Sequence, residues 1–115
     1  MALSNAVKVF PVSSANCYLG VGESTNAVAD AQADLEGSTK TYKGMETTYP
    51  TVATNVNVFR AVFDLAEANN AWEEWGIFNG NNPPTADMLL RKVDSIGTKT
   101  SAEAWQLTLT ITWLI

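Results

Sequence analysis

The sequence contains no histidine, and its only cysteine is Cys17, among 115 residues. These absences exclude an internal disulfide, a zinc site built from cysteine and histidine and a Ser-His-Asp triad. Cys17 lacks a histidine that would activate it as a nucleophile, so we expect it to be a small buried hydrophobic residue. There is no Walker loop and no complete dinucleotide-binding fingerprint. The sequence therefore predicts a protein that is not an enzyme and binds no metal or cofactor.

Charge is also scarce, because charged residues make up only 17% of the chain and the formal net charge is −5. The low charge and the 46% of hydrophobic residues predict a folded rather than a disordered chain. The negative charge argues against binding to nucleic acid or to anionic membranes. No apolar run is long enough to span a bilayer, and the N-terminus lacks the features of a signal peptide. We therefore expect synthesis in a cytoplasm without export.

Alternation of apolar and polar residues predicts several β-strands, and it is clearest from residue 105 onward. A period of two over this length is typical of a half-buried antiparallel strand. Further strands are predicted at 16–21, about 40–45, 55–65, 71–78 and 88–94, and we expect Gly97 to end the last of these. The apolar positions of the C-terminal strand are Trp105, Leu107, Leu109, Ile111, Trp113 and Ile115.

The predicted strand at 55–65 has one face that we expect to line the core. The residues of this face are Asn57, Phe59, Ala61, Phe63 and Leu65.

A short helix is predicted at about 24–36, between the first two strands. Ser24 is a suitable N-cap residue, and Gly37 stands where a left-handed residue commonly follows a helix. Val28, Ala31 and Leu35 would then share one apolar helical face.

These elements predict a mainly β protein, either an antiparallel β-sandwich or an open barrel, with one short helix near the N-terminal third. No linker or repeat marks a second domain. We therefore expect residues 15–115 to form a single domain. Residues 1–14 are expected to be an N-terminal arm or an edge strand, because Pro11 cannot donate to a central ladder.

The terminal strand and several aromatic side chains are candidates for an interface, because tryptophan and tyrosine are enriched in protein interfaces. The same aromatic residues could instead lie in the core or stack on a glycan. The apolar end of the chain is expected to be covered by the sheet or by a neighbouring subunit. The interface candidates are Tyr49, Trp72, Trp75, Trp113, Leu114 and Ile115.

The neighbouring carboxylates Glu73 and Glu74 are the remaining candidates for acid-base chemistry. Adjacent residues of a strand point to opposite faces, so these two carboxylates cannot easily act as one pair. We expect both to be solvated or ion-paired.

Six short motifs along the chain together resemble a known group of proteins. This order of motifs resembles small virion proteins of tailed phages and the N-terminal region of phage tail-collar fibre proteins, over about residues 16–113. The motifs are Tyr18-Leu19-Gly20-Val21-Gly22, Gln32-Ala33-Asp34-Leu35, Lys43-Gly44-Met45, Phe59-Arg60-Ala61, Ala71-Trp72-Glu73-Glu74-Trp75-Gly76-Ile77-Phe78-Asn79 and Met88-Leu89-Leu90-Arg91-Lys92.

The resemblance implies a non-enzymatic structural protein of a virion that forms a homo-oligomer and binds other tail or capsid subunits. Tail-collar fibres continue into a long shaft that this sequence does not contain. The resemblance therefore implies a tail, collar or baseplate adaptor or a fibre-attachment module. A capsid decoration (cement) protein is the main alternative, and a module that binds host-surface glycans is a further one.

Deletion of residues 111–115 is expected to give insoluble protein. Burial of the apolar end should contribute several kcal/mol, at roughly 25 cal/mol per Å², which is a large part of the stability of a small domain. The test is the soluble fraction after expression, and a soluble, normally assembled truncation would contradict the expectation.

Overall fold

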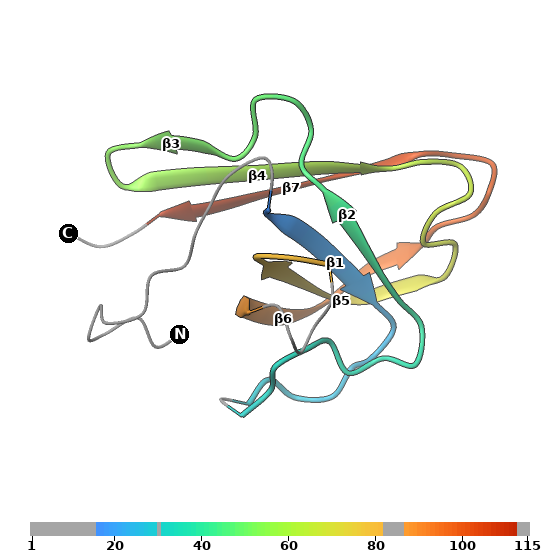
Figure 1. Ribbon diagram of the computed structural model, residues 1–115. Coiled ribbons are helices and arrows are strands. Elements are labelled where there is room, and N and C mark those ends of the chain that lie inside the picture. The colour runs from blue at the N-terminus through green and yellow to red at the C-terminus, as the bar shows by residue number, and fades with distance from the viewer. Residues whose placement is uncertain (1–15, 30, 82–86, 113–115) are drawn as a thin grey trace.

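The computed structural model describes residues 16–29, 31–81 and 87–112, and it shows two antiparallel sheets that pack against each other (Figure 1). Within these ranges every regular element is a strand, and no helix is long and apolar enough to cross a membrane. The prediction of a mainly β, antiparallel fold is confirmed, and of the two predicted architectures the two sheets correspond to the sandwich. The strands are β1 (Tyr18–Gly22), β2 (Lys40–Gly44), β3 (Thr51–Ala53), β4 (Val56–Phe63), β5 (Ala71–Phe78), β6 (Met88–Thr98) and β7 (Trp105–Thr112).

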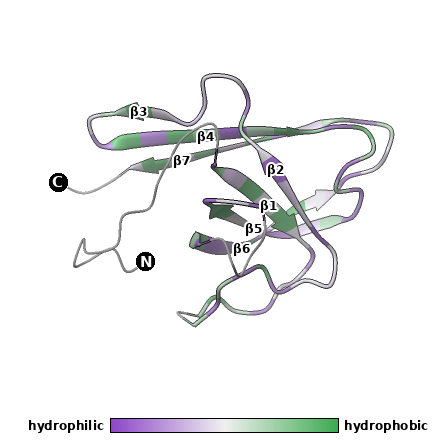
Figure 2. Ribbon diagram, in the orientation of Figure 1, coloured by the Kyte–Doolittle hydropathy of each residue, from purple (hydrophilic) through white to green (hydrophobic). Residues whose placement is uncertain are grey.

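The first sheet has the strand order β2-β1-β5-β6 and the second has the order β3-β4-β7. Apolar side chains from both sheets meet in one core, because regular strands such as β1, β4 and β7 turn every second side chain toward the other sheet. Figure 2 shows hydrophobic residues along strands of both sheets, among them β1 and β4. The core residues are Cys17, Leu19, Val21, Phe59, Ala61, Phe63, Ala68, Trp72, Ile77, Leu107 and Leu109.

Strands β4 and β7 follow their predicted alternation closely. They pair without a register shift from Val56 opposite Thr112 to Phe63 opposite Trp105. Leu107 is buried on the inner face of β7, while the glutamine and threonines between the apolar residues are exposed. The prediction for this strand is confirmed as far as residue 112.

Leu65 does not belong to the core, contrary to the prediction. Strand β4 ends at Phe63, and the backbone N–H of Glu67 then donates to the carbonyl of Asp64 in a turn. The side chain of Leu65 is 54% exposed, because the turn ends the alternation two residues earlier than expected.

A β-bulge in β6, where residues 94–96 lie opposite Glu73 of β5, accompanies a change in the direction of the β5 side chains. The register against β6 shifts between Trp72 and Glu74, and such an irregularity bends a strand and breaks its period of two. Trp72 packs in the core between the sheets, where its ring meets those of Phe63 and Trp105 at 4.9 and 5.1 Å between centroids. Glu74 instead contacts the segment 23–37, which lies on the side of the first sheet away from the second (Figure 1).

Gly97 does not end the preceding strand but lies within β6, opposite Trp72. Its φ of +148° is a backbone conformation that L-residues rarely adopt. A Cβ atom there would also lie 3.2 Å from the Trp105 ring. Glycine is therefore needed for close packing of the Trp105 indole, and the prediction that it breaks the strand was wrong.

The predicted helix at about 24–36 is not present in the described residues. Its expected apolar face does not exist, because Leu35 is 2% exposed whereas Val28 is 55% exposed. Ser24 makes a local turn, in which its hydroxyl accepts from the N–H of Asn26, but no helix follows. The prediction failed because long-range hydrogen bonds, described below, hold this segment.

Replacing Leu109 by alanine is expected to destabilise the fold by about 2–5 kcal/mol, because a buried leucine leaves a cavity. The matched control is Thr110→Ala, which changes an exposed neighbour on the same strand and should cost about 1 kcal/mol or less. Urea unfolding of both variants measures the difference. If both substitutions lower the free energy of unfolding equally, the inner face of β7 is not more buried than its outer face, which would contradict the structure.

Candidate functional site

The main polar feature of the described residues is a buried ion pair between Glu74 on β5 and Arg91 on β6. The Arg91 Nε atom lies 2.7 Å from Glu74 Oε1, and both side chains are 0% exposed. Buried charges are costly unless they are paired and hydrogen-bonded. We call this pair, together with the backbone N–H groups of Ser24, Glu36 and Gly37, the Glu74 anchor.

The Glu74 carboxylate accepts four hydrogen bonds. Its Oε1 atom accepts from Arg91 Nε at 2.7 Å and from the N–H of Glu36 at 2.9 Å. Its Oε2 atom accepts from the N–H of Gly37 at 2.8 Å and from that of Ser24 at 3.3 Å. An ionised carboxylate offers about four lone-pair sites. The carboxylate of Glu74 is therefore fully engaged by its own chain and is suited to fixing backbone rather than to exchanging protons.

Arg91 extends the anchor along the same segment. Its Nη1 atom donates to the carbonyl of Asn26 at 2.9 Å and to Gln32 Oε1 at 3.2 Å. Gln32 in turn accepts from the N–H of Ala29 and donates to the carbonyl of Ala27. Both ends and the middle of the segment are thus tied to β5 and β6, directly or through Gln32, which accounts for the missing helix.

Two glycines leave room for the anchor. A Cβ atom at Gly37 would lie 2.8 Å from Glu74 Oε2, and one at Gly22 would overlap the same oxygen. Gly37 was expected to follow a helix, but the structure shows that it lets the backbone approach a buried carboxylate.

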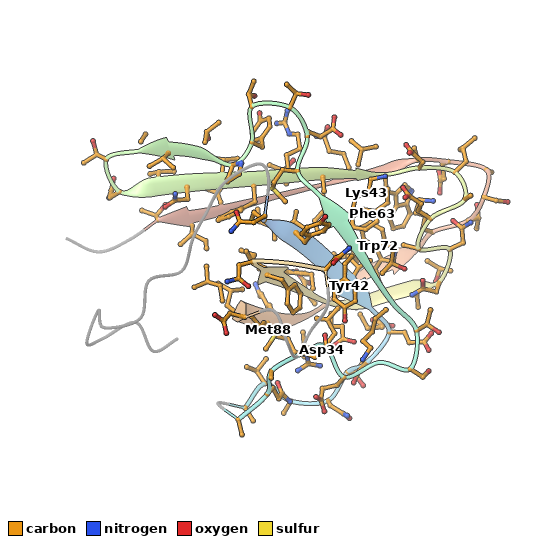
Figure 3. All side chains as sticks on the ribbon, in the orientation of Figure 1. Asp34, Tyr42, Lys43, Phe63, Trp72 and Met88 are labelled. Carbon is orange, nitrogen blue, oxygen red and sulfur yellow. The ribbon has the colours of Figure 1, made fainter. Side chains whose placement is uncertain are left out.

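Neighbouring side chains of β2 lie on opposite faces of the first sheet. Tyr42 turns outward, where its hydroxyl donates to Asp34 Oδ1 at 2.5 Å and its ring meets Phe78 edge-on at 5.3 Å. Burial, and then the Asp34 carboxylate, raise the pKa of Tyr42 well above its usual value. Lys43 turns inward toward the second sheet and donates to both carboxylate oxygens of Glu67. Figure 3 shows Tyr42 near Asp34.

Another buried charge, Lys99, holds the turn after β4. Its side chain is 1% exposed and its ammonium donates to the carbonyl of Asp64 at 2.7 Å and to Asn69 Oδ1 at 2.8 Å. Like Glu74, Lys99 is engaged by groups of its own chain.

The aromatic interface candidates do not form an exposed platform. Trp72 is 1% exposed and its Nε1 donates to the carbonyl of Ala68, so it is a core residue in this fold. Trp75 is half-buried against the core. Tyr49 is half-buried beneath the Arg60 guanidinium, 4.5 Å from its ring centroid. Trp113, Leu114 and Ile115 lie outside the described residues, as does the predicted arm at 1–14.

Chemistry at Cys17 or at a metal receives no support from the described part of the chain. Cys17 is fully buried, as predicted, and burial raises the pKa of its thiol to about 12 despite a hydrogen bond from the backbone of Tyr18. No group of three or more cysteine, aspartate or glutamate side chains is placed to hold a metal ion in the ranges described above.

Comparison with known proteins gave no significant match to any protein-family model, curated protein or solved structure.

The substitution Glu74→Gln is expected to destabilise the fold by about 3–5 kcal/mol, because it leaves the Arg91 charge buried without its partner. It should also expose the segment 23–37 to protease at concentrations that leave the parent chain intact. Urea unfolding and limited proteolysis with mass spectrometry measure the two effects.

The matched control is Glu103→Gln, which removes an exposed carboxylate from a loop. It should change the free energy of unfolding by no more than about 0.5 kcal/mol. If both substitutions behave alike, the buried pair does not organise the segment.

Proposed function

We propose that the chain is a non-enzymatic structural protein of a tailed-phage virion. It acts as a tail, collar or baseplate adaptor or as a fibre-attachment module, and it works by burying surface between subunits. The observation that carries this proposal is the edge strand β7, which is eight residues long, uncharged and paired on one side only among the described strands. The motif resemblance over about residues 16–113 supplies the virion context.

The use of the buried polar groups supports an assembly role. The carboxylate of Glu74 and the ammonium of Lys99 hold backbone segments of their own chain. Such fixed loops suit a rigid building block, because preformed surfaces associate with less loss of conformational entropy.

The glycan-binding alternative has less support. Sugar stacking needs exposed aromatic faces, whereas Trp72 is buried and both Trp75 and Tyr49 are half-buried. The capsid-decoration alternative fits a small β-sandwich as well as the adaptor does. The number of copies of this chain per particle distinguishes a tail location from a capsid location.

Particles purified by density gradient from cells that produce this chain test the proposal. The chain should co-sediment with the particles, and gel densitometry against the major capsid protein should give its copy number. Roughly six to a few dozen copies indicate the tail, whereas hundreds indicate capsid decoration, since symmetric sites repeat in those numbers. An abundant host enzyme followed through the same gradient is the control. Absence of the chain from particles would refute the proposal.

A further inference from the structure

Three of the four edge strands carry features that discourage pairing with another chain. Natural sheets protect their edges with charged residues, short strands, proline or bulges. The described β2 has five residues and carries Lys40 and Lys43, and β3 has three residues and follows Pro50. Strand β6 exposes Lys92 and Asp94 and shifts its register twice against β5.

Strand β7 has none of these features. It contains no charged residue and no proline over Trp105–Thr112, and it pairs with β4 in unbroken register. Among the strands that the structure describes, only β4 lies beside it. An edge of this kind presents a free row of backbone donors and acceptors to another strand.

We propose that β7 pairs antiparallel with β7 of a second copy of this chain across a two-fold axis. The two three-stranded sheets then become one continuous six-stranded sheet, in the order β3-β4-β7-β7-β4-β3. This goes beyond the proposed function and does not depend on it, because it rests on the edge geometry alone.

A second copy is the partner that the strand itself fits. With the axis at Thr108, this residue faces its own copy, Leu107 faces Leu109 of the partner subunit, and Trp105 faces Ile111 of the partner subunit. Each residue keeps its face of the sheet, so inner side chains meet inner ones. Threonine pairs and aromatic pairs with β-branched residues are favourable across strands. No like charges meet, although each copy has a net charge of −5.

Sedimentation velocity over about 1–300 μM tests the pairing, a range that covers dissociation constants typical of modest dimers. The parent chain should shift from its monomer mass of 12.4 kDa toward the dimer as concentration rises. Thr108→Glu should weaken the dimer at least about tenfold, because it places two carboxylates opposite each other at the axis. In the monomer the new carboxylate lies beside Arg60, which pairs with position 108, so the fold should be kept.

The matched control is Thr51→Glu. Thr51 is exposed on β3, at the opposite edge of the same sheet, so the same charge there should leave the dimer unchanged. Circular dichroism and thermal unfolding confirm that both variants are folded.

Disulfide trapping gives a second measurement that does not depend on the charged variant. Mild oxidation of Thr108→Cys should give a covalent dimer, whereas Thr51→Cys should give no covalent dimer under the same conditions. The native Cys17 is fully buried and does not compete.

A parent chain that stays monomeric at every concentration would overturn the proposal and leave the edge to a strand of a different protein. A dimer or larger oligomer that survives Thr108→Glu in a folded chain, and that is not trapped through position 108, would overturn it as well. Dimerisation of a chain that is absent from particles would uphold this inference while refuting the virion role.

Discussion

The ion pair between Glu74 and Arg91 determines how the outer side of the first sheet is built. Removing both charges from water is costly, and their mutual attraction offsets this cost only when the other hydrogen-bonding positions are also filled. Backbone N–H groups of Ser24, Glu36 and Gly37 fill those of the Glu74 carboxylate, whereas Nη2 of Arg91 is buried without a hydrogen-bond partner. The chain between β1 and β2 must therefore follow the carboxylate rather than its own helical preference. The approach is so close that glycine is required at positions 22 and 37.

The irregular pairing of β5 with the bulged strand β6 allows β5 to serve two different layers. Trp72 enters the apolar core between the sheets, while Glu74 two residues later binds the covering segment. Without the irregularity, both side chains would lie on one face of a regular strand. Gly97 completes this arrangement, because the opposite strand must let the Trp105 indole approach its backbone.

Rigid loops on one side and an open, uncharged edge on the other are consistent with a building block. The buried charges of Glu74, Arg91 and Lys99 bind groups of their own chain. A sandwich whose free strand is fixed in register by β4 can present that strand without reorganisation. This is the physical basis of the proposed assembly role.

The sequence by itself determined the strands β4, β5 and β7 and the inward faces of β4 and β7, because burial with a period of two is a local property of a strand. It also determined that Cys17 is buried. Only the tertiary structure decided that residues 24–36 are not a helix, that Gly97 continues a strand and that Trp72 is core. Arg91, directly after the apolar run Met88-Leu89-Leu90, was the one signal of a buried partner. Even so, its pairing with Glu74 could not be predicted, because the bulge and the bound segment bring together groups up to 65 positions apart.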